Sequence, residues 1–159
     1  GLHVMYVKTI LKSAINDVVD QVKKLQQENK VNTRNIIVDE DGVGGGVKDY
    51  LRCKGFINNA KAIKKENYLN LKTQCYYKLA DLINKAQIGI SCSDVNVKNY
   101  IIEELEQVRT KDADKDNKLQ IKPKDDVKAI LGRSPDYADA LAMRMFYEID
   151  NNFGKYYVQ

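Results

Sequence analysis

Acidic residues stand in two short groups whose spacing could bring carboxylates together. Asp39, Glu40 and Asp41 follow one another directly, and Asp136 and Asp139 are three residues apart much further along the chain. Carboxylate oxygens are the ligands that hard divalent cations such as Mg²⁺ and Mn²⁺ prefer. Two such ions about 4 Å apart can activate water and stabilise the leaving oxygen in phosphodiester cleavage. The two groups therefore predict metal-dependent hydrolysis, provided that the fold brings them together.

The first group lies between a predicted strand and a predicted helix. Ile36–Val38 is an unbroken run of strand formers, as expected for a strand buried on both faces. Glycines at positions 42 and 44–46 let the chain turn before helical spacing resumes at Val47. Ligands of open α/β sheets bind beyond the carboxyl ends of the strands. Asp39 is therefore the first candidate site residue.

The second group begins a predicted helix. In SPDYADAL, Ser134 can cap the helix and Pro135 suits its first position. The three-residue spacing then places Asp136 and Asp139 on one face. Each acid also has an ordinary interpretation, as a turn residue, a partner of the helix dipole or a solvated side chain. The only histidine, His3, is poorly placed as a general base, which favours metal-activated water.

The remaining chain predicts a single α/β domain over residues 1–159. A strand, a helix and a second strand at the start would form a right-handed crossover. The first strand of this crossover is expected at Leu2–Ile10 and its helix at Ser13–Glu28. Further strands are expected near Phe56 and at Gln87–Ile90, further helices at Leu69–Ala86 and Val97–Leu105, a polar-tipped hairpin at Glu106–Lys122, and a short helix after Pro123.

Composition is that of an intracellular, globular protein. The 159 residues are 43% hydrophobic and 30% charged, which suits one domain with a sizeable core. No apolar run approaches the roughly 20 residues of a membrane span, and the start does not resemble a signal peptide. The three cysteines, Cys53, Cys75 and Cys92, lack zinc-ligand spacing, so reduced structural thiols are expected.

Basic residues gather in two connecting segments, although the net charge is only +4. Such clusters can be ordinary solvated surface, or they can contact the phosphates of a nucleic acid. The residues expected to contact DNA are Arg52, Lys61, Lys64, Lys65 and Arg133.

Two motifs resemble one known family. VDEDGVGGGVKDYL and, far downstream, SPDYADAL are similar to the C-terminal nuclease domain of the large terminase subunit of tailed bacteriophages and prophages. The resemblance extends through NYLNLKTQCYYKLADLIN, EELEQVRTK and KPKDDVKAILGRSPD, which is nearly the whole chain. It implies a ribonuclease-H-like nuclease fold, with a mixed central sheet flanked by helices. It also implies an endonuclease that cuts concatemeric phage DNA during genome packaging, with two Mg²⁺ or Mn²⁺ ions held by three acids.

The resemblance assigns roles to individual residues. Asp39 matches the middle acid and Asp136 the acid on the final helix, with Asp139 as its partner or substitute. The implied partners are double-stranded DNA, the small terminase subunit and the portal protein, and the implied location is the cytoplasm of a bacterial host.

One departure concerns the family's first acid. It lies on a central strand that should precede a tract like Leu2–Ile10, and this sequence has no counterpart to it. We therefore expect a partial domain that lacks the first strands, one metal ligand and the upstream ATPase domain. Such a piece would bind metal weakly and cut DNA poorly by itself. It also contains no GxxxxGK[ST] loop for ATP hydrolysis.

Other readings stay open at this point. The acids and fold could belong to another ribonuclease-H-like nuclease, such as a junction resolvase. The glycine turn could instead cradle a phosphate at a helix start, although GVGGGV lacks the spacing of a dinucleotide site. A third possibility is a non-catalytic scaffold for DNA packaging.

Overall fold

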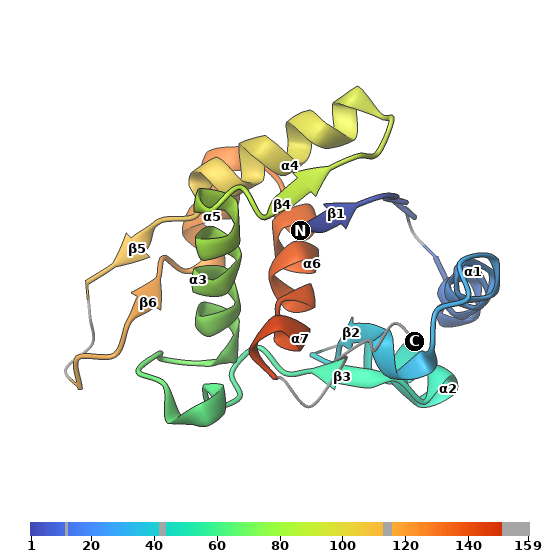
Figure 1. Ribbon diagram of the computed structural model, residues 1–159, viewed down its shortest axis with the longest axis horizontal. Helices are drawn as coiled ribbons and strands as arrows, with labels where there is room; N and C mark the ends of the chain where they lie inside the picture. Colours follow the sequence, from blue (N-terminus) through green and yellow to red (C-terminus); the bar gives the residue numbers. More distant parts are fainter. Residues whose placement is uncertain (12, 42–43, 113–115, 151–159) are drawn as a thin grey trace.

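The computed structural model describes residues 1–11, 13–41, 44–112 and 116–150 as an α/β arrangement with many helices and short strands (Figure 1). Two 3₁₀ turns, Thr33–Asn35 and Ile63–Lys65, lie in the connections. The elements in chain order are β1 (Leu2–Val4), α1 (Ile15–Glu28), β2 (Ile37–Asp39), α2 (Gly44–Leu51), β3 (Lys54–Phe56), α3 (Leu71–Asn84), β4 (Ile88–Ile90), α4 (Val95–Gln107), β5 (Thr110–Lys111), β6 (Gln120–Ile121), α5 (Lys124–Leu131), α6 (Asp136–Arg144) and α7 (Phe146–Ile149).

The strands form three separate two-stranded sheets within the described residues. β1 pairs with β4 and β2 with β3, both in parallel, while β5 and β6 form an antiparallel hairpin. The expectation of one mixed central sheet is therefore not met in detail. The strand predicted at Leu2–Ile10 also ends early, at Val4, because β4 provides backbone partners for only its first three residues. Beyond it, Met5, Tyr6 and Leu11 are exposed.

The unit from β2 through α2 to β3 forms the edge at which the first acids lie. Asp39 is in register with Phe56, so the carboxyl ends of the two parallel strands coincide. The Glu40 amide donates to the Phe56 carbonyl at 2.8 Å and extends this pairing by one residue. A Cβ at Gly44 would lie 1.5 Å from the Asp39 carbonyl oxygen, so the turn into α2 requires glycine.

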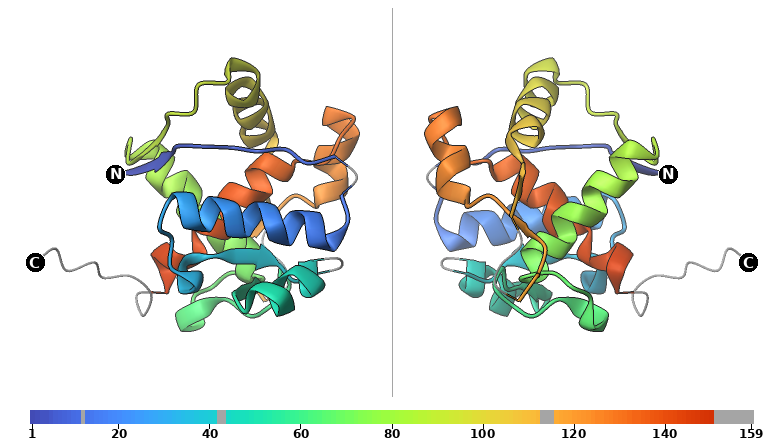
Figure 2. Two further views of the ribbon diagram at one scale, coloured as in Figure 1. Left: turned by 90° about the vertical axis from the view of Figure 1, so that its right-hand side faces the viewer. Right: turned by 90° about the vertical axis from the view of Figure 1, so that its left-hand side faces the viewer.

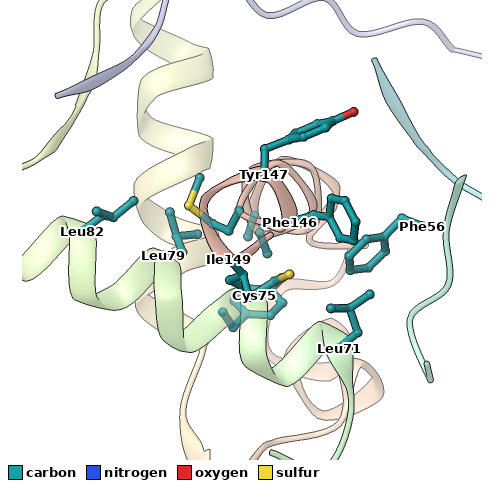
Figure 3. Close-up of a cluster of buried hydrophobic side chains, with 12 residues drawn as sticks. Phe56, Leu71, Cys75, Leu79, Leu82, Phe146, Tyr147 and Ile149 are labelled. Atoms are coloured by element: carbon teal, nitrogen blue, oxygen red, sulfur yellow. The ribbon is translucent and has the colours of Figure 1, made fainter. Parts of the chain in front are cut away.

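Two apolar clusters hold the elements together. The smaller one joins α1 to α2 through Val19, Val47 and Leu51. The larger one lies between α3 and the α6–α7 segment, and Figure 3 shows Cys75 and Leu79 of α3 beside Ile149 and Phe146 of α7. Phe56, the last residue of β3, belongs to this cluster and so packs the β2–β3 edge against the helices. The acids of β2 and α6 are consequently positioned by one shared core.

The helix that carries Asp136 and Asp139, α6, lies in the middle of the molecule. Figure 2 places α4 at one end and α2 at the other, with α6 between them, and Figure 1 agrees. No helix among the described residues is long and apolar enough to cross a membrane.

The cysteines and the hairpin complete the comparison with the sequence. Cys53, Cys75 and Cys92 are free thiols, and burial raises the pKa of Cys75 to about 12. The predicted hairpin forms with ladders of only two residues a side. Its tip, residues 113–115, lies outside the described residues.

Candidate metal-binding site

A cavity of about 210 Å³ opens where the carboxyl ends of β2 and β3 meet the beginnings of α3 and α6. All three acids proposed from the sequence as metal ligands line it, from β2 and α6. Its lining residues are Asp39, Phe56, Asn58, Lys72, Tyr76, Lys124, Asp136, Asp139, Ala140, Ala142 and Met143.

Asp39 is held in place by its own turn and by the loop after β3. Its Oδ1 accepts from the Asp41 amide at 3.1 Å and from Nδ2 of Asn58 at 3.1 Å. Asn58 also donates to Oδ2 of Asp41, from Nδ2 at 2.7 Å and from its backbone amide at 2.9 Å. These bonds from Asn58 lower the pKa of Asp41. At the end of β2, Asn58 therefore binds the carboxylates of both Asp39 and Asp41.

Asp139 is surrounded by hydrogen-bond donors. Its Oδ1 accepts from the Tyr76 hydroxyl at 2.7 Å and lies 2.7 Å from the Lys72 ammonium. Its Oδ2 lies 2.5 Å from the ammonium of Lys124. Lys72 and Tyr76 are four residues apart on α3 and so share a face, while Lys124 begins α5. Three helices thus converge on this one carboxylate.

The charges of this cluster act on one another. Burial opposes ionisation of Asp139, but Lys72 and then Lys124 outweigh it, so the pKa of Asp139 falls below its ordinary value. Burial likewise opposes the charge of Lys124, and the bond to Asp139 still raises the pKa of that ammonium. The pKa of Tyr76 is raised by burial and by the Asp139 charge, so its hydroxyl stays a donor. The cluster is accordingly ionic at neutral pH.

Asp136 has a different environment although it lies on the same helix. Its side chain is 78% exposed, against 22% for Asp139, and it lies 3.6 Å from the Lys124 ammonium. Of the two acids on α6, Asp139 is much the more firmly held. Their sequence spacing alone contained no sign of this difference.

The start of α6 is capped from another helix, which corrects the prediction for Ser134. Pro135 occupies the cap position and makes no side-chain cap hydrogen bond. Instead Oε2 of Glu104, on α4, accepts from the Ala138 amide at 2.8 Å. Glu104 is fully buried, and its other oxygen is paired with Arg133. The cap is tertiary because proline cannot supply an acceptor side chain to the first turn.

None of the basic residues expected to contact DNA lines the cavity. Arg133 pairs with Glu103 and Glu104 and lies over the Tyr100 ring. Arg52 follows α2, at the end of the β2–α2–β3 unit opposite Asp39.

The other three lysines follow the carboxyl end of β3. Lys61 and Lys65 are exposed there. Lys64 donates to the Ile149 carbonyl at 2.6 Å and lines a second cavity, of about 560 Å³. Gln74 and Tyr77 of α3 line the same cavity, on the face away from Lys72.

The side chains around the cavity determine whether a divalent cation could bind there. The described residues contain no ready group of three metal-ligating side chains. The oxygens that Mg²⁺ or Mn²⁺ would need are nevertheless present on Asp39, Asp136 and Asp139 around one cavity. At Asp139 the ammonium groups of Lys72 and Lys124 stand where cation charge would otherwise lie. The carboxylates of Asp39, Asp136 and Asp139 are therefore a donor set that suits a divalent cation in type, with the Asp139 oxygens paired to lysines in this structure.

Known proteins were compared with the chain by sequence and by structure. No protein-family model matches the sequence, and no curated protein is significantly similar to it. The structure is similar to the nuclease domain of the large terminase subunit gp2 of bacterial virus Sf6, with a TM-score of 0.71 and 22% identity over 85% of this chain and 74% of that chain. The chain has the fold of a terminase nuclease domain.

A second structure with the terminase nuclease fold supports the same match. It is a lysine-to-alanine variant of the Sf6 domain with manganese, at a TM-score of 0.72 and 22% identity, covering 85% of this chain and 75% of that one. The fold resemblance stated from the sequence motifs is thereby confirmed. Sequence reasoning did not single out Asn58, Lys72 or Tyr76. The four-residue spacing of Lys72 and Tyr76 at a helix start was the one available signal.

Proposed function

We propose that this chain is a nuclease domain that cuts phage DNA during genome packaging with the help of divalent metal ions. The observation that supports it most is the convergence of Asp39, Asp136 and Asp139 on one cavity at the carboxyl edge of β2 and β3. The terminase nuclease fold, with one similar structure containing manganese, supports the same reaction. A phosphate-binding scaffold would not need three acids facing its anionic ligand.

Asp39 and Asp139 would be the principal metal ligands, and Asp136 would be a supporting one. Asp39 is fixed by Asp41 and Asn58, and Asp139 is fixed by Tyr76, so both carboxylates are oriented in advance. Mg²⁺ or Mn²⁺, when bound, would supply an activated water and neutralise charge on the scissile phosphate. Lys72 and Lys124 would keep Asp139 ionised and then meet the incoming phosphate.

Double-stranded DNA is the proposed substrate, and we carry the five basic residues forward as its contacts. Lys61, Lys64 and Lys65 follow the carboxyl end of β3 and have the stronger case. Arg52 is a weaker candidate because it lies at the end of the β2–α2–β3 unit opposite Asp39. Arg133 is a weaker candidate because it is already paired with Glu103 and Glu104. The small terminase subunit and the portal protein are the proposed partners in packaging.

Plasmid nicking tests this function and its site. Supercoiled plasmid is incubated with Mn²⁺ and the chain, or its Asp39→Asn and Asp139→Asn variants. We expect weak cleavage that EDTA abolishes and that falls to the metal-free background in either variant, since losing even an outer-shell partner of a metal costs 10- to 100-fold. Asp136→Asn should lose less.

Asp125→Asn is the matched control for this experiment. Asp125 lies on α5 with a side chain that faces solvent, and its nearest ion-pair partner is Lys128 at 3.8 Å. This variant should cut like the parent chain. Cleavage that persists in both Asp39→Asn and Asp139→Asn would refute the site. Mn²⁺ binding without any cleavage would favour a non-catalytic packaging module.

A further inference from the structure

Asn58 occupies a junction between the two sides of the cavity. It lies two residues beyond β3, next to the end of β2, and it lines the cavity. Its side chain reaches Asp39 and Asp41, while its backbone carbonyl accepts from the Lys72 amide at 3.2 Å. One residue therefore links the strand that carries Asp39 to the helix that carries Lys72.

The chemistry of an amide determines which way this side chain must face. Ionised carboxylates only accept hydrogen bonds, so the group that meets both Asp39 and Asp41 has to be the NH₂. The carbonyl oxygen in that place would repel both carboxylates. The same nitrogen lies 3.1 Å from Asp39 Oδ1 and 2.7 Å from Asp41 Oδ2. Two like charges are thus held next to each other by one neutral donor.

We propose that Asn58 is a positioning residue of the metal site, which holds the carboxylates of Asp39 and Asp41 together so that Asp39 faces the cavity. Without the NH₂, the two carboxylates repel each other and Asp39 gains rotamers that point away from a metal. This inference rests on the proposed function, because it assumes that Asp39 binds the metal ion. It adds a residue whose role is to orient that ligand.

Mn²⁺ binding to the whole chain, measured by electron paramagnetic resonance, tests the proposal directly. Asn58→Ala should bind Mn²⁺ about 10- to 100-fold more weakly than the parent chain, as is usual when an outer-shell partner is lost. Asn59→Ala is the matched control. Asn59 is the neighbouring asparagine, its side chain accepts from Asn70 at 3.2 Å, and it does not line the cavity.

A double variant separates positioning from simple loop stability. Asp41→Asn removes the like charge beside Asp39 and retains an oxygen that can accept from the Asn58 backbone. Combined with Asn58→Ala it should therefore recover much of the lost Mn²⁺ affinity, which is non-additive behaviour. A loop that is merely destabilised would not recover. Thermal unfolding of each variant confirms that binding is measured on folded protein.

The possible outcomes distinguish this inference from the proposed function. If the parent chain binds Mn²⁺ and Asp39→Ala does not, the metal site stands. Asn58→Ala binding like the parent chain, or a double variant no better than Asn58→Ala, would then overturn the role of Asn58 alone. Equal Mn²⁺ binding by the parent chain and Asp39→Ala, or no binding by either, would overturn both.

Discussion

Asp139 has more cationic partners than either of the other two acids at the cavity. Two ammonium groups and a phenol hydroxyl lie within 2.7 Å of its oxygens, and its side chain is largely shielded from water. Charge-assisted hydrogen bonds of this kind are about twice as strong as neutral ones. Asp139 consequently has a structural role in the metal-free protein as well as its proposed role in metal binding.

The depressed pKa of Asp139 predicts a particular dependence of stability on pH. Because its pKa is lower in the folded chain than its ordinary 3.8, the stabilisation is fully present above pH 3.8 and is lost as pH falls through the folded value. Asp139→Asn should cost about 2 kcal/mol of unfolding free energy at pH 7, as expected for bonds to a charged group. Urea unfolding in EDTA at pH 7 and pH 3 measures it.

We expect the difference in unfolding free energy between Asp139→Asn and the parent chain to be smaller at pH 3 than at pH 7. Asp125→Asn, whose acid is solvated, should match the parent chain at both pH values. A gap of equal size at both pH values would mean that the charge of Asp139 contributes nothing to stability.

Residue types and spacing predicted which acids would line one cavity, but not how each is held. Asp39, Asp136 and Asp139 could be chosen because strand ends and helix starts have clear signals. Asn58 and Tyr76 could not, because an asparagine in a loop and a tyrosine on an apolar stripe have ordinary roles in most proteins. Their contacts with the acids depend on tertiary packing.

Helices α4 and α6 are joined by one buried carboxylate. Glu104 accepts from Ala138 at the start of α6 and pairs with Arg133, which precedes that helix. Arg133 has a second partner in Glu103, so it keeps one ion pair if Glu104 is lost. The position of the helix that carries Asp136 and Asp139 therefore depends on a residue outside the cavity.

Loss of this link should destabilise the protein without changing the acids. Glu104→Ala should cost about 3 kcal/mol, at the lower end for breaking a buried ion pair because Arg133 retains Glu103. Glu104→Gln keeps an acceptor for Ala138 and should cost about 1 kcal/mol. Urea unfolding measures both variants. Glu106→Ala, at an exposed position of the same helix, should stay within about 0.5 kcal/mol of the parent chain.

Helices were easier to predict from the sequence than strands. The helix predicted at Ser13–Glu28 forms at Ile15–Glu28, and the one at Leu69–Ala86 forms at Leu71–Asn84. Both have apolar stripes that persist over several turns. The strands have only two or three residues each. Where such short strands begin and end depends on distant partners, which a sequence pattern does not specify.

At the scale of the whole molecule, the basic residues proposed to contact DNA fall into separate regions. Lys61 and Lys65 are exposed after the carboxyl end of β3, while Arg52 lies at the other end of that unit. DNA placed against the cavity would meet the first region sooner than the second. The five residues should therefore contribute unequally.

Salt dependence of DNA binding measures this inequality. Replacing Lys61 and Lys65 together by glutamine should weaken duplex binding and reduce the slope of log affinity against log salt by about 2, one for each lost phosphate contact. Arg52→Gln should change the slope less. Fluorescence anisotropy of a labelled duplex, in EDTA to prevent cutting, gives both values. An unchanged slope in the double variant would mean that Lys61 and Lys65 are ordinary surface.

The hydrogen bond from the Ala138 amide to Glu104 also allows hydrogen exchange of that amide to report how often α4 and α6 separate. An amide in the first turn of a helix has no acceptor within its own helix, so it normally exchanges with solvent quickly. Here its acceptor belongs to α4 and is fully buried. Deuterium can reach this position only when the two helices part, so its exchange rate reports the free energy of that opening. We expect Ala138 to exchange far more slowly than its place in α6 suggests, and Glu104→Ala to remove the delay.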